Sequence, residues 1–80
     1  MAQVLLFGRL SDIAGWRERA FAPAATLSDL KAMIRRLDAG LADALEGPGV
    51  QAAVDRALVR GDVALGAGAE VAFLPPMSGG

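Results

Sequence analysis

Hydrophobic residues recur at steps of three and four residues between positions 27 and 41. They are Leu27, Leu30, Ile34, Leu37 and Leu41. On an α-helix this spacing brings all five side chains to one face, where they can pack against a sheet. The pattern therefore predicts an amphipathic helix as the main helical element of the chain.

The residues that flank this pattern limit the helix to about 27–39. Thr26 precedes the first hydrophobic position and Asp29 follows it by three residues, which is the spacing of a capping box with Asp in place of Glu. Arg35 and Arg36 lie near the C-terminal end, where the helix dipole favours cations. Gly40 can adopt the left-handed conformation that commonly ends a helix, so we expect the helix to stop there.

Two apolar segments that precede the helix are typical of strands. Residues 3–8 (QVLLFG) form a short apolar run, and residues 17–22 (RERAFA) begin with polar and apolar positions in alternation and end before Pro23. The segment between them, SDIAGW (11–16), is expected to turn, with Gly15 as the breaker. The two strands would then pair antiparallel.

The second half of the chain predicts further strands. They are 50–54 (VQAAV), 57–60 (ALVR) and 70–74 (EVAFL). The triplets GPG (47–49) and GAG (66–68) mark breaks between these elements, and LADALEG (41–47) is compatible with a short helical turn.

The order of these elements predicts an α+β fold with a mixed sheet. The last strand would lie beside the first and parallel to it, and one main helix would cross one face of the sheet. This is the β-grasp, or ubiquitin-like, arrangement. We expect residues 1–74 to form this domain and residues 75–80 to form an extended C-terminal tail.

Alternation along the first and last strands predicts an uncovered apolar face. If Val4, Leu6, Val71 and Phe73 contact the helix, then the opposite face carries Leu5, Phe7, Ala72 and Leu74. No predicted element remains to cover that face, and an exposed apolar patch usually marks a partner surface. Partial cover by loops is the alternative.

Composition excludes several classes of function. The chain has 80 residues, enough for one domain, and a formal net charge of −1 without a cluster of basic residues, so we expect no nucleic-acid binding. It has no Cys and no His, which removes thiol nucleophiles, disulfides and the usual zinc sites, and we expect no metal site. The apolar start, MAQVLLF, is too short for a signal peptide or a membrane span, so we expect a cytoplasmic protein.

The last eight residues, FLPPMSGG, suggest where chemistry could occur in a chain so poor in reactive side chains. Pro75 and Pro76 cannot continue a central strand and would direct the chain away from the sheet. Gly79 and Gly80 would let the backbone enter a narrow channel. The carboxylate of Gly80 could then attack the α-phosphate of ATP, and a sulfur or nitrogen nucleophile could displace AMP from the acyl-adenylate.

These segments resemble a known family. FLPPMSGG resembles the FxPPVxGG ending of the molybdopterin synthase small subunit, the MoaD-like sulfur carriers, and VLLFGRLSDIAG, AAVDRALV and GAEVAFLPP resemble other blocks of that family. The chain departs from the pattern at Met77, where Val is usual, at Asp55, where Asn is common, and at the turn 66–68.

The resemblance implies a reaction sequence. An E1-like enzyme would use ATP and magnesium to adenylate Gly80, and a cysteine desulfurase or rhodanese-like sulfurtransferase would supply the sulfur of a thiocarboxylate. The carrier would then dock on the large subunit of molybdopterin synthase, in a heterotetramer, and donate sulfur to cyclic pyranopterin monophosphate. This chain would bind no cofactor and contribute no catalytic side chain.

The resemblance also implies roles for individual residues. Gly80 would be the reactive residue, and Gly79 would allow it to enter the active sites of both partners. Met77 and Ser78, which follow the Pro75–Pro76 spacer, would line the partner's channel or act only as spacers. Phe7, Leu58 and Leu74 match family positions in the hydrophobic subunit contact, with a place in the core as the alternative.

Other functions share this fold and ending. Sulfur carriers for thiamine are often shorter and generally lack the Pro-Pro spacer, and a carrier for amino-acid sulfur is also possible. A ubiquitin-like modifier would instead attach its terminal glycine to lysines of other proteins. A plain interaction module would not need Gly79 and Gly80 at all.

Overall fold

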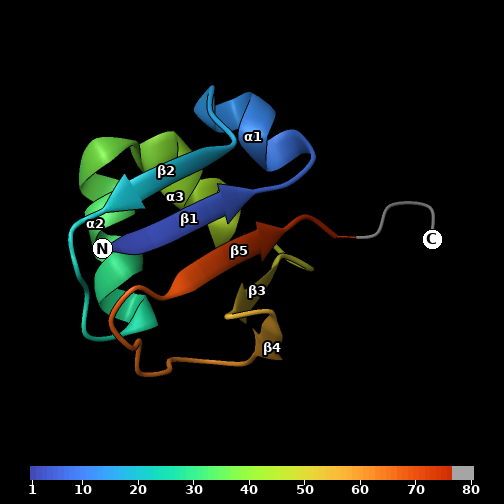
Figure 1. Cartoon of the computed structure of the whole chain (residues 1–80). Coiled ribbons are helices and arrows are strands. Elements are labelled where there is room, and N and C mark those ends of the chain that lie inside the picture. Colours follow the sequence, from blue (N-terminus) through green and yellow to red (C-terminus); the bar gives the residue numbers. More distant parts are fainter. Residues whose placement is uncertain (77–80) are drawn as a thin grey trace.

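Figure 1 presents a computed structural model that describes residues 1–76. A five-stranded mixed sheet has the order β2-β1-β5-β3-β4. Its elements are β1 (Ala2–Leu6), α1 (Arg9–Ala14), β2 (Glu18–Phe21), α2 (Leu27–Leu37), α3 (Ala39–Leu45), β3 (Gln51–Val54), β4 (Ala57–Val59) and β5 (Glu70–Leu74). β1 pairs antiparallel with β2 and parallel with β5. The predicted β-grasp fold is confirmed.

The core lies between the sheet and the three helices. In Figure 1, α2 and α3 stand behind the sheet and α1 lies at the top, beyond the end of β1. The strand residues expected to contact the helix, Val4, Leu6, Val71 and Phe73, are all buried. Each helix contributes at least one fully buried leucine to the same cluster: Leu10 from α1, Leu30 from α2 and Leu41 from α3. Burial of this apolar layer is the main term that stabilises so small a domain.

The connection between β1 and β2 corrects one prediction. The segment expected to turn at 11–16 is largely a helix, α1, which begins at Arg9 and ends at Ala14. Leu10 anchors it with 1% exposure, and the Ser11 hydroxyl donates a hydrogen bond of 2.8 Å to the Gly8 carbonyl. Gly15 ends the helix in the left-handed conformation. Six residues are too few for periodicity to distinguish a helix from a turn.

The main helix also ends earlier than predicted. α2 stops at Leu37, and Gly40 lies inside the next helix, α3, so the prediction of a left-handed stop at Gly40 is wrong. Asp38 separates the two helices with φ −156°, and its carboxylate accepts a 3.0 Å hydrogen bond from the N–H of Leu41. Leu41 therefore enters the core from α3, whereas Leu37 is 46% exposed.

No helix in the described part of the chain has the length and apolar character that crossing a membrane requires.

Candidate functional site

The sheet face opposite the helices, here called the open face, is apolar toward one end. Strand register aligns Leu5, Ala72, Ala53 and Leu58 in a row across β1, β5, β3 and β4. Phe7 and Leu74 follow one step closer to the C-terminal end of β5, because side chains on one face recur at every second residue. The apolar half of the open face therefore lies next to the point where β5 ends.

The three residues predicted to contact a partner all lie on this half of the open face. Leu58 is 64% exposed and Phe7 is 47% exposed, while Leu74 is half-buried between its neighbours. The other two residues of the predicted patch, Leu5 and Ala72, are also half-buried. Exposed aromatic and leucine side chains around a half-buried floor form a surface suited to an apolar partner.

The opposite half of the open face is polar. Gln3 and Glu70 lie directly opposite each other on β1 and β5. The Gln3 amide donates a 3.2 Å hydrogen bond to the carboxylate of Glu18, which pairs with Leu5 from β2 and so stands at the border of the apolar half. Arg56 approaches Glu70 at 4.0 Å. A partner that covers the apolar half would meet a charged and hydrogen-bonding rim here, as in most protein interfaces.

The chain leaves the sheet through Pro75 and Pro76, next to the apolar half. β5 is the central strand, so the prolines emerge between the end of β1 and the start of β3. Gly8 packs against Pro75 and Gly49 against Pro76. The residues predicted to follow them in the tail, Met77, Ser78, Gly79 and Gly80, lie outside the residues that the structure describes.

The sequence patterns did not identify Gly8 and Gly49 as part of this site. Gly8 is the last residue of the predicted strand 3–8, and Gly49 belongs to the GPG break, so both were interpreted only as the ends of elements. Their contact with the two prolines depends on β1 and β3 lying on either side of β5. The one sequence feature that could have identified them is a glycine close to the end of a strand that neighbours the last strand.

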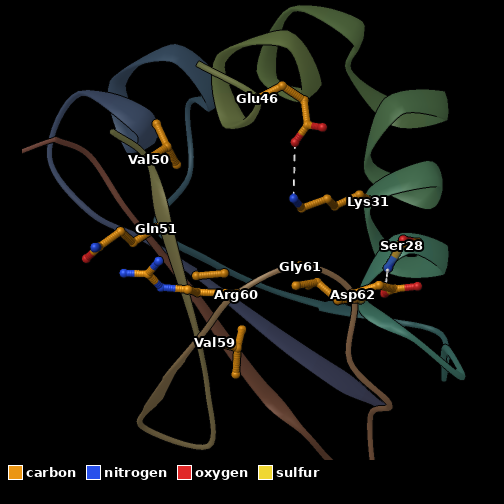
Figure 2. Close-up of a pocket in the computed structure, with 11 residues that line it drawn as sticks. Ser28, Lys31, Glu46, Val50, Gln51, Val59, Arg60, Gly61 and Asp62 are labelled. Atoms are coloured by element: carbon orange, nitrogen blue, oxygen red, sulfur yellow. Dashed lines mark hydrogen bonds and ion pairs between the residues drawn. The ribbon is translucent and has the colours of Figure 1, made fainter. Parts of the chain in front are cut away.

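Apart from the open face, the surface has a hollow of about 520 Å³ (Figure 2). It lies between α2, the residue after α3 and the β3–β4 hairpin. Lys31 extends from α2 to Glu46 and makes a 3.1 Å ion pair with it. The Asp62 carboxylate accepts a 2.8 Å hydrogen bond from the N–H of Ser28 in the first turn of α2. This hydrogen bond lowers the pKa of Asp62 below its usual value.

Three of the four charged residues that line this hollow stabilise the helices around it. Lys31 and Glu46 tie α2 to the end of α3, and Asp62 caps the N-terminus of α2. Within residues 1–76 no cluster of three or more acidic side chains is arranged to hold a metal ion. The open face and the exit of β5 are therefore the candidate site.

Comparison with known proteins identifies the family. A model of the ThiS family matches residues 4–80, which is nearly the whole sequence. The chain belongs to the ThiS family. Among curated proteins no match was found.

Several solved structures resemble this ThiS-family chain. SAMP1 from Haloferax volcanii has 24% identity and a TM-score of 0.81, with 99% of this chain and 98% of that one covered. The small archaeal modifier protein 1 (SAMP1) from Methanosarcina acetivorans has 20% identity and a TM-score of 0.85, with 99% and 95% covered. In a complex of subunits 1 and 2 of molybdopterin-converting factor from Helicobacter pylori 26695, one chain has 25% identity and a TM-score of 0.70, with 99% and 97% covered.

These comparisons confirm the resemblance to MoaD-like proteins at the level of the family. The ThiS-family chain has the ubiquitin-like β-grasp fold of these structures.

Proposed function

We propose that this chain is the sulfur carrier subunit of a molybdopterin synthase and that its reactive group is the carboxylate of Gly80. One observation supports this most strongly: β5 leads through Pro75 and Pro76 out of the sheet beside the apolar half of the open face. A partner docked on that half would lie next to Pro75 and Pro76. The Helicobacter pylori match, which is a chain in a two-subunit complex, supports a large-subunit partner.

Activation is the first step of the proposed reaction. A carboxylate oxygen of Gly80 attacks the α-phosphorus of ATP on an E1-like enzyme, and the bond to pyrophosphate breaks. A persulfide sulfur from a cysteine desulfurase or sulfurtransferase then displaces AMP. Reductive cleavage of the resulting acyl disulfide by a thiol leaves a thiocarboxylate. ATP and magnesium belong to the activating enzyme, and this chemistry is expected to take place in the cytoplasm.

Sulfur transfer follows on the large subunit. Phe7, Leu58 and Leu74 contact that subunit, and Met77 and Ser78 lie in its channel. The thiocarboxylate sulfur attacks a carbon of cyclic pyranopterin monophosphate as a C–O bond of that carbon breaks. Water then cleaves the acyl–sulfur bond, so the sulfur stays on the pterin and Gly80 regains its carboxylate. The chain has neither Cys nor His, so acid–base catalysis comes from the partners. The carrier contributes the acyl group and the surface that brings it to the active site.

The intact mass of the protein tests this function. The chain is incubated with ATP, an E1-like activating enzyme and a sulfur source, and we expect an increase equal to the replacement of one oxygen by sulfur, located at Gly80. Addition of the large subunit and the pterin precursor should return the mass to its starting value and yield molybdopterin. Extension of the chain by one alanine after Gly80 is the matched control and should prevent the mass change. An unchanged mass, with an activating enzyme that converts another carrier, would contradict the proposal.

The second candidate is a protein modifier. It is favoured by the two SAMP1 structures, whose TM-scores of 0.81 and 0.85 exceed the 0.70 of the molybdopterin-converting factor chain. A modifier would form isopeptide bonds between Gly80 and lysines of other proteins. Mass spectrometry of tryptic peptides distinguishes the two functions, since branched peptides indicate the modifier and a free thiocarboxylate indicates the carrier.

A further inference from the structure

Two glycines flank the point where the chain leaves the sheet. Gly8 lies two residues beyond the end of β1, and Gly49 lies two residues before the start of β3. β1 runs parallel to β5 and β3 runs antiparallel to it, so the end of β1 and the start of β3 meet the end of β5 at the same edge. Pro75 and Pro76 therefore pass between the two glycines.

Both contacts are too close for any side chain on the glycine. A Cβ on Gly8 would lie 2.9 Å from Cγ of Pro75, and a Cβ on Gly49 would lie 2.6 Å from Cβ of Pro76. Carbon atoms attract one another best at about 3.5–4.0 Å, so either methyl group would push the facing proline away. The proline rings cannot yield by rotation of a flexible side chain, because they are closed onto the backbone.

Backbone conformation alone does not explain these two glycines. Gly8 and Gly49 have φ of 57° and 82°, but Gly15, Gly61 and Gly68 also have positive φ, of 83°, 68° and 70°. At those three positions nothing lies within 4 Å of an added Cβ. Among the glycines of residues 1–76, only Gly8 and Gly49 combine a positive φ with close contact to another segment, and in both cases that segment is the exit of the C-terminal strand.

We propose that Gly8 and Gly49 are positioning residues for the reaction at Gly80. They hold Pro75 and Pro76 from two sides and so determine the direction in which the backbone leaves the sheet. The inference rests on the proposed function, because its purpose is to present Gly80 to the activating enzyme. Because the direction of the backbone at Pro75 and Pro76 is fixed before docking, the chain loses less conformational entropy when it binds the activating enzyme.

Alanine substitutions with matched controls test this role. Gly49→Ala is compared with Gly15→Ala, since the two glycines have nearly the same φ, 82° and 83°, and nothing lies within 4 Å of a Cβ added at Gly15. Gly8→Ala is compared with Gly61→Ala, which also places alanine at a positive φ (57° and 68°). Because Gly8 has ψ −136°, its own backbone strain is separated by the cycle with Pro75→Ala. Each variant is assayed well below its own melting temperature. We expect kcat/KM for adenylation, followed by ATP–pyrophosphate exchange, to fall roughly 10- to 100-fold for Gly8→Ala and Gly49→Ala and to stay near wild type for the controls.

A double-mutant cycle separates positioning from general loss of structure. Pro75→Ala removes Cγ and Cδ, the atoms that the methyl group introduced by Gly8→Ala would approach at 2.9 and 3.8 Å. If Gly8 acts through Pro75, then Gly8→Ala should cause no further loss of kcat/KM in the Pro75→Ala background. A loss of equal size in both backgrounds would overturn the inference.

An NMR measurement without the activating enzyme distinguishes failure of the positioning role from failure of the proposed sulfur-carrier function. Nuclear Overhauser effects are expected between the α-protons of Gly8 and Pro75 Hγ, and between those of Gly49 and Pro76 Hβ, and they should disappear in the corresponding alanine variants only. Absence of these effects in the wild-type chain would refute the positioning role, as would full adenylation of Gly8→Ala and Gly49→Ala. A wild-type chain that shows these effects but is never adenylated would instead refute the proposed function, and with it the role assigned to the contacts.

Discussion

Asp62 stabilises the start of α2 from a distant part of the sequence. Thr26 accepts a 3.1 Å hydrogen bond from the N–H of Asp29, as the capping spacing predicted. Asp62 satisfies a second free donor of that first turn, the N–H of Ser28, from 34 residues further along the chain. A carboxylate at this position also interacts favourably with the helix dipole. Two caps of different origin therefore define where α2 begins.

The Asp62 cap should make stability depend on pH. Its pKa is lowered in the folded protein by the hydrogen bond from Ser28, so the unfolded state binds the proton more tightly and the stabilisation is lost as pH falls below the usual value of 3.8. We expect Asp62→Ala to lower the melting temperature at pH 7 and to have a smaller effect at a pH well below 3.8. Asp62→Asn keeps an acceptor oxygen and serves as the control, with a smaller loss at pH 7. Equal losses for Asp62→Ala at both pH values would contradict this account.

Asp55 has a local role that explains one departure from the resembled family. Asp55 and Arg56 form the two-residue turn between β3 and β4 with φ of 49° and 71°. Asn and Asp tolerate this left-handed conformation better than other residues with a Cβ. The Asp55 carboxylate also accepts a 2.9 Å hydrogen bond from the N–H of Glu70. Asp thus meets the conformational need of this turn.

At the scale of elements, the break between α2 and α3 is the main difference from the sequence pattern. The pattern contained five hydrophobic positions on one continuous helix, but Asp38 interrupts the helix before the fifth. Its carboxylate caps α3 while its N–H still bonds to the carbonyl of Ile34 at the end of α2. One residue therefore closes one helix and opens the next, and α3 turns to place Leu41 in the core.

A substitution at Gly40 distinguishes this arrangement from the predicted one. Gly40 lies inside α3, and the nearest atom to an added Cβ is an Asp38 oxygen at 3.5 Å, an ordinary contact. Alanine has the higher helix propensity, so Gly40→Ala should raise the free energy of unfolding by about 0.5–1 kcal/mol in a urea titration. A left-handed glycine that ends a helix would lose stability on the same change. A lower free energy of unfolding for Gly40→Ala would therefore support the original prediction of a left-handed stop at Gly40.

At the scale of the whole molecule, the open face and the exit of β5 form one region. The helices cover only the other face of the sheet, and the apolar half of the open face adjoins Pro75 and Pro76 (Figure 1). Under the proposed function, a partner docked on the apolar half would therefore also lie beside Pro75 and Pro76. This geometry links the binding surface to the proposed reactive group without any catalytic side chain.

Charge substitutions test whether the apolar half binds the partner. Phe7→Asp and Leu58→Asp place a charge on side chains that are 47% and 64% exposed, so the free energy of unfolding should change little. Binding to the large subunit, measured by titration calorimetry, should weaken roughly 30-fold or more if these residues are interface anchors. Leu37→Asp is the matched control, at 46% exposure on the end of α2, and should bind as wild type. Equal weakening by all three would contradict the assigned surface.

Several features followed from the sequence alone. Strand alternation predicted which side chains of β1 and β5 are buried, and the order of elements predicted their parallel pairing. These succeeded because side-chain period and connection length are local properties that limit the possible topologies. The chemistry assigned to Gly80 also came from the sequence and stays a prediction, because residues 77–80 lie outside the described structure.

Tertiary structure decided what depends on contacts between distant segments. The short helix α1 is stabilised by burial of Leu10 in the core. The helix α2 is capped by Asp62, and no local sequence pattern predicts this contact. Gly8 and Gly49 are 41 positions apart in the printed sequence and acquire a shared role only because β1 and β3 enclose β5. Period and propensity describe single elements, whereas burial, long-range caps and close backbone contacts arise only when the elements pack together.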